Sequence, residues 1–447
     1  MMIRAIPTLV YHHERVSTRQ VLTNRPGRTP SILDLPRETL ELIHAHLIST
    51  PTQWLHVHYP NDLAACTTAC LRLVCWRWAE WLYVNHLYHG LKFDNASRSN
   101  EFIAYQRSRS ELLPHAKCQH LVIGRIWTTR EAPTGDVGLQ DMITSEILEN
   151  LLDLFPTTIL TLDLQFVDHP SLPIGNIQAI KRIESLRELH LNLSPTSVGN
   201  QPTTPTDPEF FNALIVAAQG IKSLVLGIPI SLDYEPEPGM WGDRPYPAIT
   251  HLHVNMLFQR TIDILRLSIA FKPSLKVLSV QANEQEGRED LIDRLFQLGF
   301  THEGFENLGV RMSRIGRVYE LLKESLEGLS ISSSHILRDN IFTQAPIEIL
   351  AINAQAAFDQ CDPMFFGNPL AHLPKLKKLV FMNAPADYSA PPKFLEACEA
   401  LDVQCVYIDH YQMPLIMVSL LFLMQFSSPF NVPIGTIPPK GIISIKG

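Results

Sequence analysis

Two apolar patterns follow each other along this chain of 447 residues. Between positions 35 and 78, apolar residues recur at the spacing of one face of an α-helix. After about residue 115 a shorter unit recurs, in which an apolar residue, two mostly polar residues, a leucine and one further residue precede another apolar position. Such a unit fits a short strand, and most copies follow a helix-like segment. The patterns predict an α/β chain with a small helical module followed by alternating helices and strands.

The repeated unit has clear and weaker copies. The clear copies are 185–191, 220–226, 274–280, 325–331, 346–352 and 375–381. The weaker copies centre on Leu121, Leu162, Leu252, Leu308 and Val406. Most central positions lie 21 to 30 residues apart, which is the period of leucine-rich repeats.

The array resembles the leucine-rich-repeat family in a degenerate, irregular form. The resemblance implies a solenoid with parallel strands on its concave face and helices outside. The family's asparagine or cysteine, three residues after the last apolar position, is matched only by Asn283. Because that asparagine normally pairs with buried backbone groups, the turns must be satisfied in another way. An ordinary α/β domain is the alternative interpretation.

The N-terminal helical pattern has a fixed order of residues. Leu35-Pro36 precedes an apolar helix face, and a second apolar set ends with Val-Cys-Trp-Arg-Trp at 74–78. This order resembles the F-box family, although the connection 49–61 is longer than that family usually allows. The resemblance implies that a Skp-type adaptor, and through it a cullin, is bound by Leu35, Pro36, Leu40, Ile43, Leu47, Leu63, Val74 and Trp78. The alternative is two amphipathic helices of an all-α domain.

These patterns divide the chain into five parts. Residues 1–30 form a basic tail that we expect to be flexible, with five arginines against one acid. The F-box-like module takes 31–90, a linker helix region takes 91–115, and the solenoid takes 116–412. The last part, 413–447, contains thirteen nearly unbroken apolar residues, fewer than the roughly twenty that a membrane helix needs.

Composition and motifs exclude several classes of function. The net charge of −8 argues against general nucleic-acid binding, which needs a basic surface. Seven scattered cysteines without a CxxC pair, and no recognisable signal sequence, favour a cytoplasmic or nuclear location away from membranes. The sequence has no nucleotide-binding glycine loop, HExxH or GxSxG motif. We therefore expect no catalytic residue and no cofactor.

Strand periodicity indicates which polar side chains lie opposite the helices. Successive strand residues point to opposite faces, so the positions between the apolar ones should line the concave face. These positions are polar in the first half of the array and mostly small or apolar later. With two aromatic residues of the proline-rich loop 232–247, the predicted target-binding residues are Asp163, Glu188, His190, Trp241, Tyr246, His251 and His253.

The same register predicts which side chains are buried. Four central leucines should lie between sheet and helices: Leu189, Leu278, Leu329 and Leu350. Three polar neighbours should be exposed on the concave face: His190, Ser279 and Ser330. Although His251 and His253 share one strand face, no carboxylate or cysteine set at ligand spacing accompanies them, so no metal site is expected.

Together these features indicate a non-catalytic substrate-recognition subunit of an SCF-type cullin–RING ubiquitin ligase. The resemblance implies that the F-box binds the adaptor while the solenoid holds a target protein for ubiquitination. One alternative is a solenoid interaction scaffold outside the ubiquitin system, in which the F-box-like helices only cap the array. A third class is a hydrolase that uses His251, His253 and neighbouring acids.

Overall fold

The structure is a computed structural model. It describes residues 37–49, 71, 76–109, 117–127, 141–167, 171–193, 208–228, 248–255, 261–281, 318–331, 337, 342–354, 368–385 and 388–408. The chain forms two compact units, residues 1–55 and 56–447, and each is described by itself.

The first unit contains helix α1 (Arg37–Ser49). Leu40 is buried on this helix, whereas Leu42 is 72% exposed. The helix predicted after the leucine-proline pair is therefore present. In the N-terminal part of the predicted adaptor surface, Leu35, Pro36 and the side chain of Leu47 lie outside the described residues.

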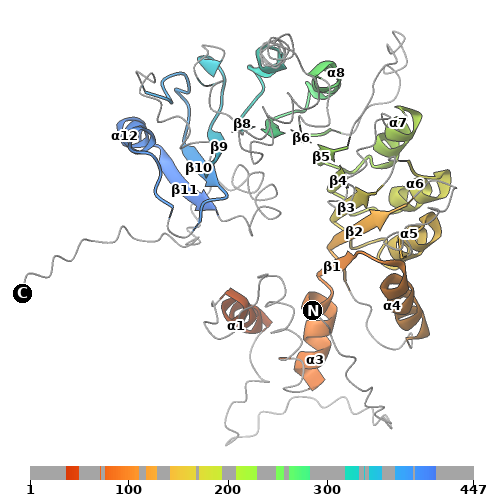
Figure 1. The fold of residues 1–447 in the computed structure, drawn as a ribbon. Coiled ribbons are helices and arrows are strands. Elements are labelled where there is room, and N and C mark those ends of the chain that lie inside the picture. Colours follow the sequence, from red (N-terminus) through yellow and green to blue (C-terminus); the bar gives the residue numbers. More distant parts are fainter. Residues whose placement is uncertain are drawn as a thin grey trace, which may run out of the picture. The chain divides into compact units, whose positions relative to one another are not determined.

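The second unit is built on one sheet of eleven strands, which lie in sequence order (Figure 1). The strands are β1 (Gly90–Phe93), β2 (His120–Ile126), β3 (Thr161–Phe166), β4 (Glu188–Leu193), β5 (Ser223–Gly227), β6 (His251–Asn255), β7 (Val277–Gln281), β8 (Gly328–Ile331), β9 (Ile349–Asn353), β10 (Lys378–Met382) and β11 (Gln404–Ile408). Every pairing is parallel. A parallel sheet in strict chain order is what the strand–helix repeats predicted.

Leucines form a row across the sheet, because leucine is paired with leucine from Leu121 in β2 to Leu379 in β10. Burying one leucine side chain stabilises a fold by about 1.5–3 kcal/mol, so the row is a main source of stability. The predicted burial is confirmed, with at most 2% exposure, for Leu189, Leu278, Leu329 and Leu350.

Helices cover one face of this sheet. They are α4 (Ala96–Ser108), α5 (Ser145–Leu152), α6 (Ile174–Lys181), α7 (Pro208–Ala217), α8 (Thr261–Phe271) and α12 (Pro392–Leu401). Their buried residues belong to the same apolar core as the strand leucines. Helices α4 to α7 pack side by side, each against the next (Figure 1). The predicted solenoid of strands on one side and helices on the other is therefore observed.

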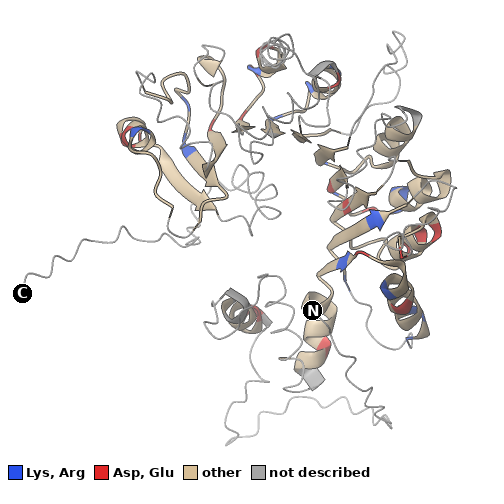
Figure 2. Ribbon diagram, viewed as in Figure 1, with Lys and Arg blue, Asp and Glu red and all other residues tan. Residues whose placement is uncertain are grey.

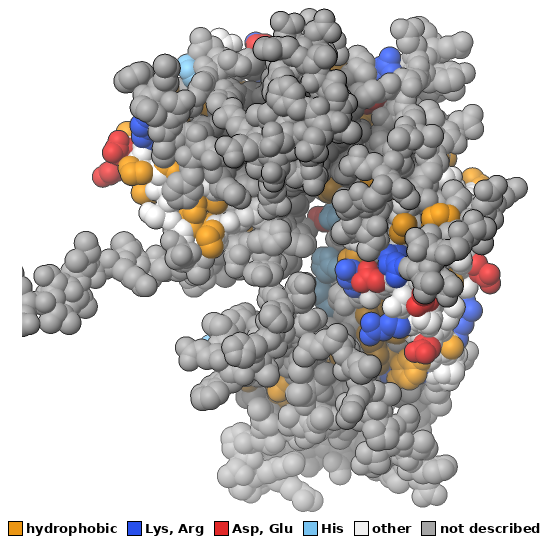
Figure 3. Space-filling view, in the orientation of Figure 1, with side chains coloured by type: hydrophobic (Ala, Val, Ile, Leu, Met, Phe, Trp, Pro, Cys, Tyr) orange, Lys and Arg blue, Asp and Glu red, His pale blue; other side chains and the backbone are white. Residues whose placement is uncertain are grey.

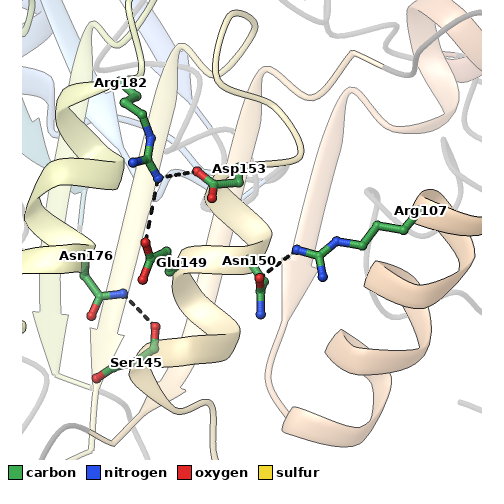
Figure 4. A network of polar contacts seen from close by, with 7 residues as sticks. All are labelled: Arg107, Ser145, Glu149, Asn150, Asp153, Asn176 and Arg182. Atoms are coloured by element: carbon green, nitrogen blue, oxygen red, sulfur yellow. Dashed lines mark hydrogen bonds and ion pairs between the residues drawn. The ribbon is translucent and has the colours of Figure 1, made fainter.

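Polar contacts connect neighbouring helices on the solvent side (Figure 4). Arg107 of α4 donates to Asn150 of α5 at 2.7 Å, and Arg182 after α6 pairs with Asp153 after α5 at 2.6 Å. The Arg182 and Asp153 side chains are 50% and 43% exposed, so this pair contributes only about 0–1 kcal/mol. Charges of both signs also lie on α4 and α12 (Figure 2). The apolar core, not this layer, holds the repeats together.

The sheet begins one repeat earlier than the sequence pattern indicated. Strand β1 pairs with β2, and α4 follows β1 as the helix of the first repeat. Residues 91–115 were expected to be a linker helix region. Both elements lie within this range, except that β1 begins at Gly90. The strand escapes the pattern because its four residues, Gly-Leu-Lys-Phe, contain only two apolar positions.

Strand β7 is hydrogen-bonded directly to β8. The strand predicted around Leu308, which falls between them in the sequence, lies outside the described residues. Further predicted features outside the described residues are Leu63, Val74, Trp241, Tyr246, the tail 1–30 and the apolar segment 413–447.

A short helical segment precedes the sheet. Helix α3 (Trp76–Leu82) continues directly into a π-helical turn, η2 (Tyr83–Leu87). Trp78 is 3% exposed and packs edge-on against Trp81, with 5.8 Å between the ring centroids. Trp78 was predicted to bind the adaptor, and in this structure it contributes to the packing of α3.

Candidate binding surface

Strands β3 to β6 carry a polar face on the side of the sheet opposite to the helices. Residues between the polar positions, such as Leu164 and Leu191, lie in the core on the helix side. All five strand residues predicted for target binding are on this face, and histidine side chains gather beside the strands in Figure 3. The term polar face is used below for Thr161, Asp163, Gln165, Glu188, His190, Asn192, Ser223, His251, His253 and Asn255.

Glu188 is the centre of one group of contacts on the polar face. Its carboxylate accepts a hydrogen bond from Thr161 Oγ1 at 3.3 Å and lies 3.6 Å from His190 Nε2. Thr161 Oγ1 in turn lies 3.2 Å from His120 Nδ1. Glu188 is only 5% exposed, so its oxygens have little access to water. A carboxylate has room for about four donors, but the burial of Glu188 limits the access of a donor from a partner.

Asp163 is the centre of a second group. Its two carboxylate oxygens accept hydrogen bonds from Gln165 Nε2 at 3.1 Å and Asn192 Nδ2 at 2.9 Å. The Asn192 side chain occupies the space that a Cβ at Gly227 would fill, so this position in β5 requires glycine. The two amides hold the carboxylate in one orientation, which preorganises it for a partner.

His251 and His253 of β6 form a third group. His251 is fully buried, and its Nδ1 lies 3.5 Å from Ser223 Oγ. His253 Nδ1 lies 2.7 Å from Ser279 Oγ in β7. Burial, and secondly the neighbouring His253 and His190, lowers the pKa of His251 to about 3. The imidazole of His251 is therefore neutral at pH 7.

Two histidines at the edge of the polar face, His89 and His120, also have lowered pKa values. The pKa of His120 is lowered mainly by burial, while Glu188 acts in the opposite direction. The His89 ring lies 5.0 Å from the His120 ring, and burial followed by His120 lowers its pKa as well. These imidazoles are neutral near pH 7, so they add no formal charge to this part of the sheet.

Two buried imidazole nitrogens on the polar face have no hydrogen-bond partner, namely His190 Nε2 and His251 Nε2. The distance of 3.6 Å from His190 Nε2 to Glu188 is too long for a hydrogen bond. A buried polar atom without a partner destabilises a fold by about 1–3 kcal/mol. A bound polar group that reached these atoms would recover part of that free energy.

The polar face is less exposed than the sequence predicted. Ser279 and Ser330 are 2% and 3% exposed, and the His190 side chain is 15% exposed. Parallel strands lie about 4.8 Å apart, so a large side chain can cover a small one on the next strand or on the strand after it. Ser279 contacts His253, and Ser330 Oγ lies 3.7 Å from Met382 Sδ. The predicted exposure was wrong for both serines, and His190 is only partly exposed.

The described residues give no support to metal or hydrolase chemistry. Among them, no group of three or more His, Cys, Asp or Glu side chains is arranged to hold a metal ion. His253 does contact a serine hydroxyl, but Ser279 is buried, and a nucleophile must reach its substrate. The described helices also include none long and apolar enough to cross a membrane.

The same side of the sheet is apolar from β9 to β11. The sequence signal is the unbroken apolar runs Ile-Leu-Ala-Ile in β9 and Leu-Val-Phe-Met in β10, which are typical of strands buried on both faces. Sequence reasoning described the concave positions of the later strands as mostly small or apolar, but missed that those of β9 to β11 form one cluster. Its members are Ile349, Ala351, Val380, Met382, Val406 and Ile408.

Among the residues predicted to bind the adaptor, the described side chains are those of Leu40, Ile43 and Trp78. Leu40 and Trp78 are buried, and Ile43 is partly buried. Leu40 and Ile43 belong to the first unit and Trp78 to the second, so the adaptor-binding set stays a prediction.

Comparison with known proteins adds little to the topology. No family model matches the sequence. No curated protein matches it. The crystal structure of the leucine-rich repeat-containing protein LegL7 from Legionella pneumophila is similar with a TM-score of 0.37 and 13% identity, covering 71% of this chain and 89% of that chain. This TM-score is too low to assign a fold. The repeat architecture is therefore based on the sheet topology.

Proposed function

We propose that this protein is a non-catalytic substrate-recognition subunit of an SCF-type cullin–RING ubiquitin ligase in the cytoplasm or nucleus. In this proposal the module in 31–90 binds a Skp-type adaptor and, through it, a cullin. The solenoid binds a target protein. The observation that carries the proposal is the F-box-like order from Leu35-Pro36 to 74–78, followed in the same chain by a repeat solenoid.

Helix α1 supports the adaptor-binding half of the proposal. It begins at Arg37, directly after the leucine-proline pair that the F-box resemblance requires. Proline is common at the start of a helix, because its fixed φ angle suits the helical backbone. Leu40 and His44 share the buried side of α1, one turn apart, as expected for an amphipathic helix.

The polar face supports the target-binding half. The residues of β3 to β6 include no Lys or Arg, while Asp163 and Glu188 carry formal negative charge. Two side-chain amides contact the Asp163 carboxylate, and Thr161 and His190 lie beside the Glu188 carboxylate. Charge complementarity therefore favours a target segment with basic or hydrogen-bond-donating side chains. The chain would contribute proximity, because holding two reactants together removes much of the entropic barrier to their reaction.

A solenoid interaction scaffold outside the ubiquitin system is the second candidate. The observation in its favour is the way residues 76–89 join the first repeat. Tyr88 packs edge-on against Tyr83 at 5.1 Å and Phe102 at 5.7 Å, and the His89 carbonyl accepts hydrogen bonds from the backbone at the start of β2. Such packing is typical of a terminal cap on a repeat array.

Adaptor binding distinguishes the two candidates. The Leu35→Ala, Pro36→Ala double variant should lose binding to a purified Skp-type adaptor in pull-down and calorimetry. An apolar anchor in a desolvated interface contributes about 2 kcal/mol or more, so the Kd should rise at least about thirtyfold. The matched control is His253→Ala, which changes the solenoid and should bind the adaptor like the unchanged protein.

Undiminished binding by the double variant would remove the F-box assignment. If the unchanged protein itself does not bind the adaptor, the scaffold becomes the better description of its function.

A further inference from the structure

The last described repeat contains two cysteines that point into the same layer. Cys398 lies on α12 and is 3% exposed, within the apolar core that also contains Phe394. Cys405 lies on β11, where it is paired with Leu379 of β10. Leu379 belongs to the core on the helix side, so its neighbour Cys405 also faces α12.

The turn between the two elements brings these side chains close. Helix α12 ends at Leu401, and the next residue, Asp402, adopts the left-handed conformation with a φ of 54°. Directly after it, the Val403 N–H donates to the Cys398 carbonyl at 2.8 Å. Strand β11 therefore starts beside the last turn of the helix. The Cys398 and Cys405 thiols are joined by a side-chain hydrogen bond.

The two thiols differ in ways that suit different roles. The hydrogen bond with Cys398 lowers the pKa of Cys405, whereas the same bond and burial raise the pKa of Cys398. Cys405 is also partly exposed, and Cys398 is buried. A thiolate is the reactive form of cysteine, so Cys405 is the sulfur that an oxidant in solution would reach first.

We propose that Cys405 and Cys398 form a redox-active pair, which hydrogen peroxide oxidises to an intramolecular disulfide. The Cys405 thiolate attacks one peroxide oxygen, the O–O bond breaks, and a sulfenic acid forms while the other oxygen leaves as water after taking up a proton. The Cys398 sulfur then attacks the Cys405 sulfur, and the S–S bond forms as a second water leaves. Two thiols and one hydrogen peroxide give one disulfide and two waters.

The bond would join α12 covalently to the last described strand of the sheet. On its other side, β11 contributes Val406 and Ile408 to the apolar cluster of β9 to β11. The disulfide would therefore restrain the strand that borders this cluster. This inference does not depend on the ubiquitin-ligase proposal.

The chain offers an internal control in Cys118. This cysteine is fully buried, and burial raises its pKa to about 12. Its Sγ donates to the His120 carbonyl at 3.5 Å. A buried, protonated thiol reacts slowly with peroxide, so Cys118 should remain reduced.

The test uses the reduced full-length protein, treated with hydrogen peroxide, then alkylated and mapped by peptide mass spectrometry. The expected product links Cys398 to Cys405 with the loss of two hydrogen atoms, returns to two thiols with dithiothreitol, and leaves Cys118 alkylated. A background variant simplifies the map by replacing with serine the cysteines outside the described residues: Cys66, Cys70, Cys75 and Cys361.

Two single variants assign the roles of the sulfurs. In Cys398→Ser, the Cys405 sulfenic acid should accumulate and be trapped by dimedone. In Cys405→Ser, oxidation at Cys398 should slow by at least about tenfold, because the accessible thiolate is gone. If Cys398 and Cys405 stay reduced in the unchanged protein, or are oxidised no faster than Cys118, the proposal is wrong. Mapping of the unchanged protein decides this even if a variant fails to fold.

Discussion

His251 is a fully buried base within the sheet, with Ser223 Oγ 3.5 Å from one ring nitrogen. Its surroundings favour the neutral ring, because burial and the neighbouring His253 and His190 lower its pKa from 6.5 to about 3. In the unfolded chain the pKa returns to its ordinary value. Between these two values the unfolded state binds more protons than the folded state, so folding stability must fall as the pH falls.

The pH dependence of unfolding tests this residue. From pH 6.5 downward, His251 should lower the free energy of unfolding by about 1.4 kcal/mol per pH unit, and above pH 6.5 its contribution is constant. In His251→Gln this part of the slope should disappear from denaturant titrations at several pH values. The control, Val254→Ala in the same strand, should lower stability equally at each pH. An unchanged slope in His251→Gln would show that another group is responsible.

Residue burial could be predicted from the sequence on one side of the sheet only. The leucine row follows from the strand period, since each strand has one side facing its own helix. Ser279 and Ser330 are covered by His253 and Met382, which come from other strands. Their burial depends on side-chain sizes across the sheet, which the period of a single strand does not specify.

At the scale of elements, each strand is held by the two strands beside it. Leu278 in β7 is paired with Leu252 in β6 and Leu329 in β8, and all three are at most 2% exposed. A cavity at Leu278 would therefore weaken two repeat interfaces. In a solenoid, stability is close to a sum of repeat and interface free energies, so such damage should spread only to the neighbouring repeats.

Replacement of Leu278 by Ala should lower the free energy of unfolding by about 2–5 kcal/mol. The exposed Lys272, six positions earlier in the same repeat, is the matched control, and Lys272→Ala should change stability by less than about 0.5 kcal/mol. Denaturant unfolding measures both, and hydrogen exchange should show the largest loss of protection in β6 to β8. Equal effects of the two substitutions would contradict the packing described for β7.

The order of the elements was more predictable than their number. Repeated strand–helix units imply a parallel sheet in chain order. The helix after each strand returns the chain to the end of the sheet at which that strand began, so the next strand runs in the same direction. Strand β1 was missed, since Gly90–Phe93 has only two apolar positions. The strand expected around Leu308 lies outside the described residues. Three apolar positions are too little information to separate a strand from chance in so apolar a chain.

In the second unit as a whole, one side of the sheet changes from polar to apolar along the array. Asp163, Glu188 and the histidines lie on β3 to β6, whereas Ile349, Val380 and Ile408 occupy the equivalent side of β9 to β11. The sequence predicted the polar half from alternating positions. It did not predict that Glu188 and His251 are buried, which leaves Asp163 and His253 as the more accessible polar groups.

Target recognition should therefore depend on the polar face. Proximity labelling with and without proteasome inhibition would first identify the target. The Asp163→Asn, His253→Ala double variant should then bind it at least about tenfold more weakly, since charged groups that are desolvated in an interface contribute 2 kcal/mol or more. The target's half-life in cells should lengthen, while adaptor binding stays unchanged.

The matched control changes two acids on α12, Glu396→Gln and Glu399→Gln, and should leave the half-life as it was. If the target is degraded normally with the polar-face variant but escapes after changes in β9 to β11, the binding site lies in the apolar half of the array.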